Sequence, residues 1–167
     1  MEIETSDPAG LTATVTIEVR AEVEDVFRRI ADLPRMATFS PECLTCKWME
    51  GGPGIGGSRF RGFNRLGPFR WWTQGWVVKV ESPRTFVFET SAGFGPRTYP
   101  VTRWTYRLED IPGATRVSEQ VTVLKLVRVA RRLPFLMRLR VRQLKRGMES
   151  TLRKLKVTVE TESGRDR

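Results

Sequence analysis

Apolar and polar residues alternate strictly along residues 11–19, where aliphatic side chains are separated by threonine and glutamate. This pattern predicts a strand with one buried face. Apolar residues then recur at helical spacing over 23–30 among charged residues, which predicts a short amphipathic helix. We expect the helix to end at 32–34 (Asp-Leu-Pro), because proline disfavours helical backbone at the residue before it. A second turn or short helix is expected over 35–39.

The middle of the chain has the pattern of strands separated by turns. Six strands are predicted, at about 44–50, 57–65, 69–81, 84–91, 100–109 and 115–124. Glycine and proline are concentrated between them, as hairpin turns require. Because no helix intervenes, these strands favour an antiparallel meander.

A long helix is predicted to begin near Pro134, since proline is tolerated in a first helical turn. Its apolar residues step by three or four and form one narrow stripe: Met137, Val141, Leu144, Met148, Leu152, Leu155 and Val159. The order of elements predicts an α+β fold, in which a curved antiparallel sheet of about seven strands wraps around this helix. Two short helices follow the first strand. We expect one domain over residues 1–167, with a core at about 11–160 and flexible ends at 1–10 and 161–167.

The composition excludes several kinds of chemistry. The 167 residues include no histidine, which excludes Ser-His-Asp triads, His-ligated metals and imidazole acid–base catalysis. Cys43 and Cys46 have CxxC spacing, but no further cysteine completes a zinc site. Residues three apart on a strand face opposite sides, so we expect two incidental thiols rather than a redox pair. No metal and no cofactor are expected.

The N-terminus is acidic and lacks the basic start and apolar stretch of a signal peptide. No apolar run approaches the roughly 20 residues of a membrane-spanning helix. A soluble, cytoplasmic protein is therefore expected.

Seven segments resemble parts of one known superfamily. They are AEVEDVF (21–27), IADLP (30–34), FSP (39–41), GGSRFRG (56–62), WTYRL (104–108), TRVSE (115–119) and GMESTLRKL (147–155). The superfamily is that of the START-like (SRPBCC) polyketide cyclase/dehydrase and lipid-transport proteins, and the resemblance covers about residues 11–160. It implies the helix-grip fold, with a deep cavity for a hydrophobic or aromatic ligand between the sheet and the long helix.

The aromatic content of the strands independently favours such a cavity, because small-molecule pockets are mostly apolar and aromatic. The alternative is that these side chains simply fill a core. The candidate ligand-binding residues are Phe39, Phe60, Phe63, Trp72, Gln74, Trp76, Phe88, Trp104, Met137, Val141, Leu144 and Met148. Within 69–81, the face with Trp72, Gln74 and Trp76 is the more hydrophobic and is expected to point inward, although a bulge could exchange the faces partway.

Glu119 is the leading candidate for acid–base chemistry, since it shares a strand face with valines. Desolvation there would raise its pKa. The alternative is an ion pair with an arginine such as Arg103 or Arg107. Tyr106 and Thr73 are the other candidate catalytic residues.

Tetracenomycin-type aromatase/cyclases are similar in fold, and that resemblance implies an inward arginine on the strand after an aromatic pair. Aligning the pair with Trp71-Trp72 leaves Thr73 and Gly75 where those enzymes carry serine and arginine. The missing arginine favours a binding or carrier role, but both this role and a cyclase/dehydrase activity stay open.

The positive charge is concentrated in one segment. Residues 125–156 contain twelve Lys or Arg and one acid, against a net charge of +10 for the whole chain. Six basic residues share one side of the predicted helix: Arg138, Arg142, Lys145, Arg146, Arg153 and Lys156.

This basic face has four interpretations: a solvated surface, a site for an anionic membrane, a site for nucleic acid, or a site for an acidic protein partner such as a carrier protein. Nucleic acid is an unfavoured partner, because no recognised motif accompanies the charge. The leading interpretation of the whole chain is a protein that binds a hydrophobic, polyketide- or lipid-like small molecule. The alternative is a peripheral membrane or interaction module, such as a lipid or quinone carrier, that works through the basic helix.

Overall fold

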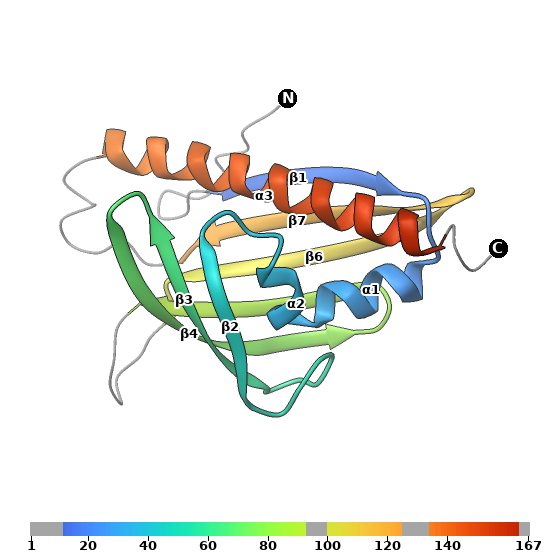
Figure 1. Ribbon diagram of the computed structural model, residues 1–167, viewed down its shortest axis with the longest axis horizontal. Coiled ribbons are helices and arrows are strands. Elements are labelled where there is room, and N and C mark those ends of the chain that lie inside the picture. The colour runs from blue at the N-terminus through green and yellow to red at the C-terminus, as the bar shows by residue number, and fades with distance from the viewer. Residues whose placement is uncertain (1–11, 93–99, 125–133, 164–167) are drawn as a thin grey trace.

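A seven-stranded antiparallel sheet, two short helices and one long helix make up the computed structural model, which describes residues 12–92, 100–124 and 134–163 (Figure 1). The elements are β1 (Thr12–Val19), α1 (Val23–Ala31), α2 (Leu33–Ala37), β2 (Cys43–Glu50), β3 (Arg59–Leu66), β4 (Phe69–Glu81), β5 (Thr85–Ala92), β6 (Thr102–Ile111), β7 (Ala114–Val123) and α3 (Pro134–Ser163). The predicted α+β class and the helix-grip arrangement are confirmed.

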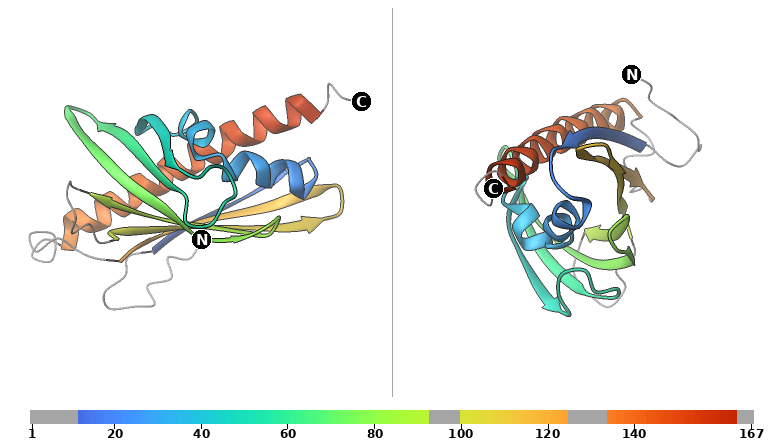
Figure 2. Two further views of the ribbon diagram at one scale, coloured as in Figure 1. Left: turned by 90° about the horizontal axis from the view of Figure 1, so that it is seen from below. Right: turned by 90° about the vertical axis from the view of Figure 1, so that its right-hand side faces the viewer.

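The sheet has the order β1-β7-β6-β5-β4-β3-β2, so the meander from β2 to β7 ends beside β1. Figure 2 shows the sheet curving into a trough with the helices on its open side. The two edge strands are covered, since α3 packs on β1 and α2 packs on β2. The space between the sheet and the helices therefore becomes the interior of the protein.

The first helix forms as its periodicity predicts, with Val23, Val26, Phe27 and Ile30 buried. The second helix begins at Leu33, two residues before the predicted start. Pro34 lies in its first turn, where a missing N–H breaks no helical hydrogen bond. The helix therefore starts directly after the first one ends.

Strand β4 corrects one sequence prediction. Thr73 lines the interior and Gly75 and Val77 are buried, whereas Trp72 is 41% exposed. The face that carries Trp72, Gln74 and Trp76 thus points outward, and the prediction that it points inward is wrong. A bulge between Val77 and Lys79 exchanges the faces, so that Val80 packs against the core.

The physical reason lies in the neighbouring strand. A Cβ atom at Gly75 would lie 2.2 Å from Cζ of Phe60, so the missing side chain leaves the space that this ring fills. The apolar residues of the outer face pack against each other instead, as the rings of Phe63 and Trp72 do with centroids 4.5 Å apart. Hydrophobicity alone therefore indicated the wrong face.

The stripe on α3 faces the sheet, with Leu144, Met148, Leu152, Leu155 and Val159 all buried. Val141 is half-buried and packs against a small cluster that contains Leu144 and Met148. The side chain of Met137 lies outside the described residues. The C-terminal half of this stripe joins α1 and α2 in the main core.

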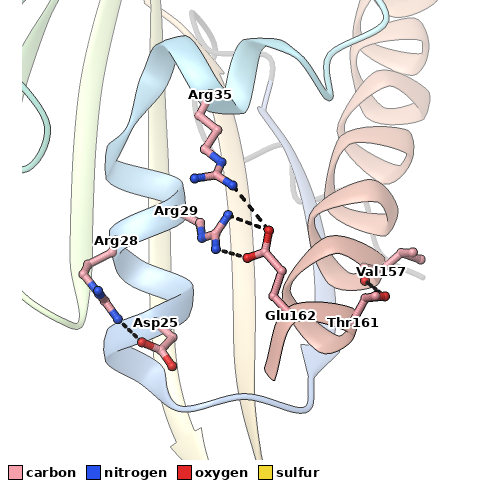
Figure 3. A network of polar contacts seen from close by, with 7 residues as sticks. All are labelled: Asp25, Arg28, Arg29, Arg35, Val157, Thr161 and Glu162. Carbon is pink, nitrogen blue, oxygen red and sulfur yellow. Dashed lines mark hydrogen bonds and ion pairs between the residues drawn. The ribbon is translucent and has the colours of Figure 1, made fainter. Parts of the chain in front are cut away.

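An ion-pair network holds this end of α3. Glu162 accepts hydrogen bonds from Arg29 on α1 and from Arg35 on α2, the latter at 3.4 Å (Figure 3). Residues 161–163, the first part of the end expected to be flexible, belong to this helix. Residues 164–167 lie outside the described chain.

Candidate ligand-binding cavity

An internal cavity of about 530 Å³ lies between the concave face of the sheet, α2 and the part of α3 from Arg140 to Thr151. This volume is within the range of small-molecule sites. Its wall is mainly apolar, and the packed core with α1 and the end of α3 fills the rest of the trough. The fold thus leaves one end of its interior open to a ligand.

Five of the candidate ligand-binding residues line this cavity: Phe60, Phe88, Trp104, Leu144 and Met148. Three of them form an aromatic wall. The ring centroid of Phe88 lies 5.5 Å from that of Phe60 and 6.1 Å from that of Trp104. Contact of these residues with a ligand stays a prediction.

Of the other seven candidates, the side chain of Met137 lies outside the described residues, and the remaining six do not line the cavity. Phe39 packs against the core, and Val141 packs beside the cavity wall. Phe63, Trp72, Gln74 and Trp76 lie on the outer face of the sheet, for the reason given above for β4. Strand alternation shows which residues share a face but not which face is inside.

Two candidate catalytic residues meet at the cavity wall. Tyr106 on β6 lies opposite Glu119 on β7, and its hydroxyl donates a hydrogen bond to Oε1 of Glu119 at 2.6 Å. Both side chains are buried, and Oε2 of Glu119 has no partner among the described residues. The alternative of an ion pair with Arg103 or Arg107 is wrong. Arg103 points to the other face and binds Glu89 at 2.6 Å, and Arg107 is exposed whereas Glu119 is buried.

Burial determines the protonation of this pair. Desolvation raises the pKa of Glu119 to about 7, although the hydrogen bond from Tyr106 opposes the shift. Burial, and then the nearby charge of Glu119, raise the pKa of Tyr106 well above its ordinary value. Near neutral pH, Glu119 is therefore the group that can gain or lose a proton.

Thr73, the third candidate catalytic residue, lines the same cavity. Its hydroxyl oxygen accepts a hydrogen bond from Nδ2 of Asn64 at 3.1 Å. The hydroxyl in turn donates to the carbonyl of Gly62 at 3.5 Å. This hydroxyl already has protein partners.

Position 75 bears on the cyclase comparison. A side chain there would meet Phe60 at 2.2 Å and the carbonyl oxygen of Glu89 at 2.7 Å. The position aligned with the cyclase arginine has no room for a side chain while Phe60 keeps its place.

Both cysteines line the cavity, against the expectation that they face opposite sides. A bulge between Cys43 and Thr45 shifts the alternation of β2 and turns both thiols inward. They are unpaired thiols. Burial raises the pKa of Cys43 to about 11 and that of Cys46 to about 12, which keeps them protonated and weakly nucleophilic.

Sequence reasoning missed Arg140 and Glu42, which both line the cavity. They form a bidentate ion pair with N···O distances of 2.6 and 2.7 Å, and the guanidinium lies 6.0 Å from the ring centroid of Trp71. Arg140 lies four residues before Leu144, so the two side chains share one face of the helix. A charged residue beside the apolar stripe was therefore the sequence signal that Arg140 lines the cavity.

The predicted basic face of α3 lies outside the cavity. Arg138, Arg142, Arg146 and Arg153 are exposed, and Lys145 is half-buried. Within the described segments, none of these five side chains forms an ion pair with a carboxylate. Lys156 differs, since it pairs with Glu160 at 3.6 Å and donates to the carbonyl of Glu18.

The described residues form neither a membrane span nor a metal cluster. No helix among them is long and apolar enough to cross a membrane. Residues 12–92, 100–124 and 134–163 also bring together no group of three or more Cys, Asp or Glu side chains suited to a metal ion.

Solved structures share this fold at low sequence identity. The crystal structure of TTHA0849 from Thermus thermophilus superposes with a TM-score of 0.67 at 17% identity, covering 91% of this chain and 99% of that one. Ara h 8.0201 gives a TM-score of 0.63 at 12% identity, covering 91% and 99%. The di-domain ARO/CYC StfQ from the steffimycin biosynthetic pathway gives 0.73 at 14% identity, covering 93% of this chain and 52% of StfQ.

The comparison with curated proteins gave no match. A family model described as "Polyketide cyclase / dehydrase and lipid transport" matches residues 11–160. With the sheet, the long helix and the apolar cavity between them, the chain belongs to this polyketide cyclase/dehydrase and lipid-transport family.

Proposed function

We propose that the protein binds a hydrophobic small molecule, aromatic or lipid-like, in the cavity between the sheet and α3. The observation that carries this proposal is a mainly apolar cavity of about 530 Å³ with Phe60, Phe88 and Trp104 in its wall. Burying apolar ligand surface there is favourable by about 25 cal/mol per Å² removed from water, before the costs of association.

A neutral fluorescent probe, N-phenyl-1-naphthylamine, tests this proposal by titration. The Leu144→Trp substitution fills part of the cavity and should weaken probe binding at least tenfold. The matched control is Val157→Trp, which places the same side chain on the exposed side of α3, where Val157 is 65% exposed. Equal probe affinity in the two folded variants would contradict binding in the cavity.

The natural ligand can be sought directly. Native mass spectrometry of the protein as purified, followed by solvent extraction, would reveal a co-purified lipid, quinone or polyketide. The Leu144→Trp variant should carry less of that compound than the Val157→Trp variant does.

Catalysis in the same cavity is a second proposal. It is supported by the buried Glu119, whose pKa of about 7 suits a general acid or base at neutral pH. In this proposal Glu119 moves the proton, and Tyr106 and Thr73 orient the substrate. Conversion of the extracted compound by the wild type but not by Glu119→Gln would support it, whereas equal conversion by both would contradict it.

A further candidate function is docking of α3 to an anionic membrane, from which a hydrophobic ligand could be loaded. It is supported by the exposed arginines of α3 and by two exposed apolar residues, Leu139 on α3 and Phe69 on the β3–β4 hairpin. This hairpin lies near the first turns of α3, where Arg140 covers Trp71. Each basic residue near an anionic surface contributes about 1 kcal/mol.

Liposome co-sedimentation tests the docking proposal. We expect binding to phosphatidylglycerol vesicles at low salt, and its loss in the variant Arg138→Glu/Arg142→Glu/Arg146→Glu. The control variant Arg59→Glu/Arg84→Glu/Arg107→Glu has the same charge change at exposed arginines elsewhere. Equal loss in both variants would indicate a general charge effect, and no binding at low salt would leave an acidic carrier protein as the partner to test.

A further inference from the structure

One polar atom of the cavity wall lacks a partner. Among the buried side-chain polar atoms that have no hydrogen-bond partner in the described chain, Oε2 of Glu119 is the one whose residue lines the cavity. Glu119 is only 2% exposed, so bulk water does not compensate this atom. An unpartnered buried polar atom is costly, and a ligand that restores the hydrogen bond would remove this cost.

The neighbours of Glu119 determine what the free oxygen can do. Across the sheet it lies between Tyr106 on β6 and Val15 on β1. The cationic side chains nearby are used elsewhere, since Arg103 binds Glu89 on the outer face and Arg140 binds Glu42. Nothing in the described structure therefore stabilises a negative charge on Glu119 except the hydrogen bond from Tyr106.

The hydrogen bond from Tyr106 determines which oxygen of Glu119 carries the proton when the carboxyl group is neutral. Tyr106 donates to Oε1, which must then act as an acceptor. In the neutral carboxyl group the proton belongs on the other oxygen, Oε2. That atom becomes a hydrogen-bond donor without a protein acceptor.

We infer that Glu119, in its protonated form, donates a hydrogen bond through Oε2 to an oxygen of the ligand. The ligand class is then a hydrophobic molecule with a carbonyl-type acceptor at its buried end. This inference rests on the proposed cavity-binding function. A ligand with an ammonium group would instead require the ionised carboxylate.

Burial supports the protonated form, since it raises the pKa of Glu119 to about 7. Three other titratable groups that line the cavity, Cys43, Cys46 and Tyr106, do not titrate in the same range. Cys43 and Cys46 have pKa values of about 11 and 12 and stay protonated, and the pKa of Tyr106 is raised well above 10. A change in binding near pH 7 would therefore report on Glu119.

Two probes of matched shape test the inference: 2-acetylnaphthalene, which carries a ketone, and 2-isopropenylnaphthalene, in which a methylene group replaces the ketone oxygen. Dissociation constants are measured by quenching of tryptophan fluorescence at pH 5.5 and pH 8.5. At pH 5.5 we expect 2-acetylnaphthalene to bind about tenfold more tightly than 2-isopropenylnaphthalene. At pH 8.5, where Glu119 has lost its proton, the two probes should bind with equal affinity.

Two substitutions at the same position separate the donor from the charge. Glu119→Gln keeps an N–H donor that does not titrate, so the ketone preference should persist at both pH values. Glu119→Leu removes the donor and should bind both probes equally. The control is Glu89→Gln, the same change at a buried carboxylate on the outer face, and it should behave like the wild type.

The outcomes distinguish this inference from the proposed function. If neither probe binds the folded wild type, both are wrong. Binding of both probes with equal affinity at pH 5.5, or a ketone preference that grows with pH or persists in Glu119→Leu, overturns the inference alone.

Discussion

Glu42 and Arg140 form a bidentate ion pair that joins the residue before β2 to the first part of α3, 98 positions further along the chain. Their side chains are 17% and 30% exposed, and both line the cavity. Partial burial and two parallel hydrogen bonds distinguish this pair from the exposed ion pairs of the sheet. The pair thus holds one wall of the cavity in place.

Removing one member of this pair should destabilise the protein more than removing both. Arg140→Met leaves Glu42 without a partner, and we expect a loss of about 2 kcal/mol in the free energy of unfolding. The double variant Glu42→Gln/Arg140→Met should recover part of this loss, which a double-mutant cycle in urea measures. The exposed pair Lys79–Glu81 is the control and should give a smaller coupling energy. Equal coupling energies in the two cycles would refute the structural role.

The stability of the protein should fall as pH rises from about 4.5 to 7. Glu119 has a pKa of about 7 in the folded state against 4.5 ordinarily, so the folded state holds its proton more tightly than the unfolded state. The stabilisation is complete below pH 4.5 and is lost as pH rises through 7, with a total of about 3 kcal/mol. Between pH 4 and pH 8, the free energy of unfolding of Glu119→Gln should therefore rise by about this amount relative to that of the wild type, as measured by urea unfolding. A constant difference between the two proteins across this range would contradict the assignment.

The two cysteines should react slowly with alkylating agents in the folded protein. Burial keeps the pKa of Cys43 at about 11 and that of Cys46 at about 12, so the reactive thiolate is scarce at pH 8. We expect alkylation by iodoacetamide to be at least about tenfold slower than in the urea-unfolded chain, as followed by mass spectrometry. Because both thiols line the cavity, N-phenyl-1-naphthylamine should slow the reaction further. Labelling as fast as in the unfolded chain would show that the thiols are not buried.

Gly75 should tolerate no side chain. A Cβ atom there would lie 2.2 Å from the ring of Phe60 and 2.7 Å from the carbonyl oxygen of Glu89. We expect Gly75→Ala to lower the free energy of unfolding by about 2 kcal/mol or more, because ring and strand must both shift. Gly56→Ala is the matched control, since nothing lies within 4 Å of a Cβ atom at that position. Similar stability of the two variants would mean that β3 and β4 can separate without cost.

Local periodicity was sufficient to predict the fold. Alternation predicted β1 and the meander, and the apolar stripe of α3 predicted the helix that packs across the sheet. Both patterns arise within a few residues of backbone geometry, about 3.6 residues per helical turn and two per strand repeat. They could therefore be read without knowing what each element packs against. The α+β class and the order of the elements follow from them, whereas the helix-grip fold with its cavity was what the family resemblance implied.

The site depended on relationships between elements. Which face of β4 points inward was decided by Gly75 beneath Phe60 and by the bulge after Val77. A second bulge turned both Cys43 and Cys46 into the cavity. A bulge moves every later side chain to the other face, and strand alternation carries no sign of where it will occur.

The partner of Glu119 was likewise decided by tertiary structure. The sequence placed this carboxylate on an apolar strand face, and the register of β6 against β7 put Tyr106 opposite it while Arg103 pointed away. The sequence by itself thus determined the order of helices and strands, and it identified Glu119 as a candidate acid on an apolar strand face, because both depend on the periodicity of neighbouring residues. Only the tertiary structure decided the hydrogen-bond partner, the free oxygen and the cavity it faces, because register and curvature belong to the whole sheet.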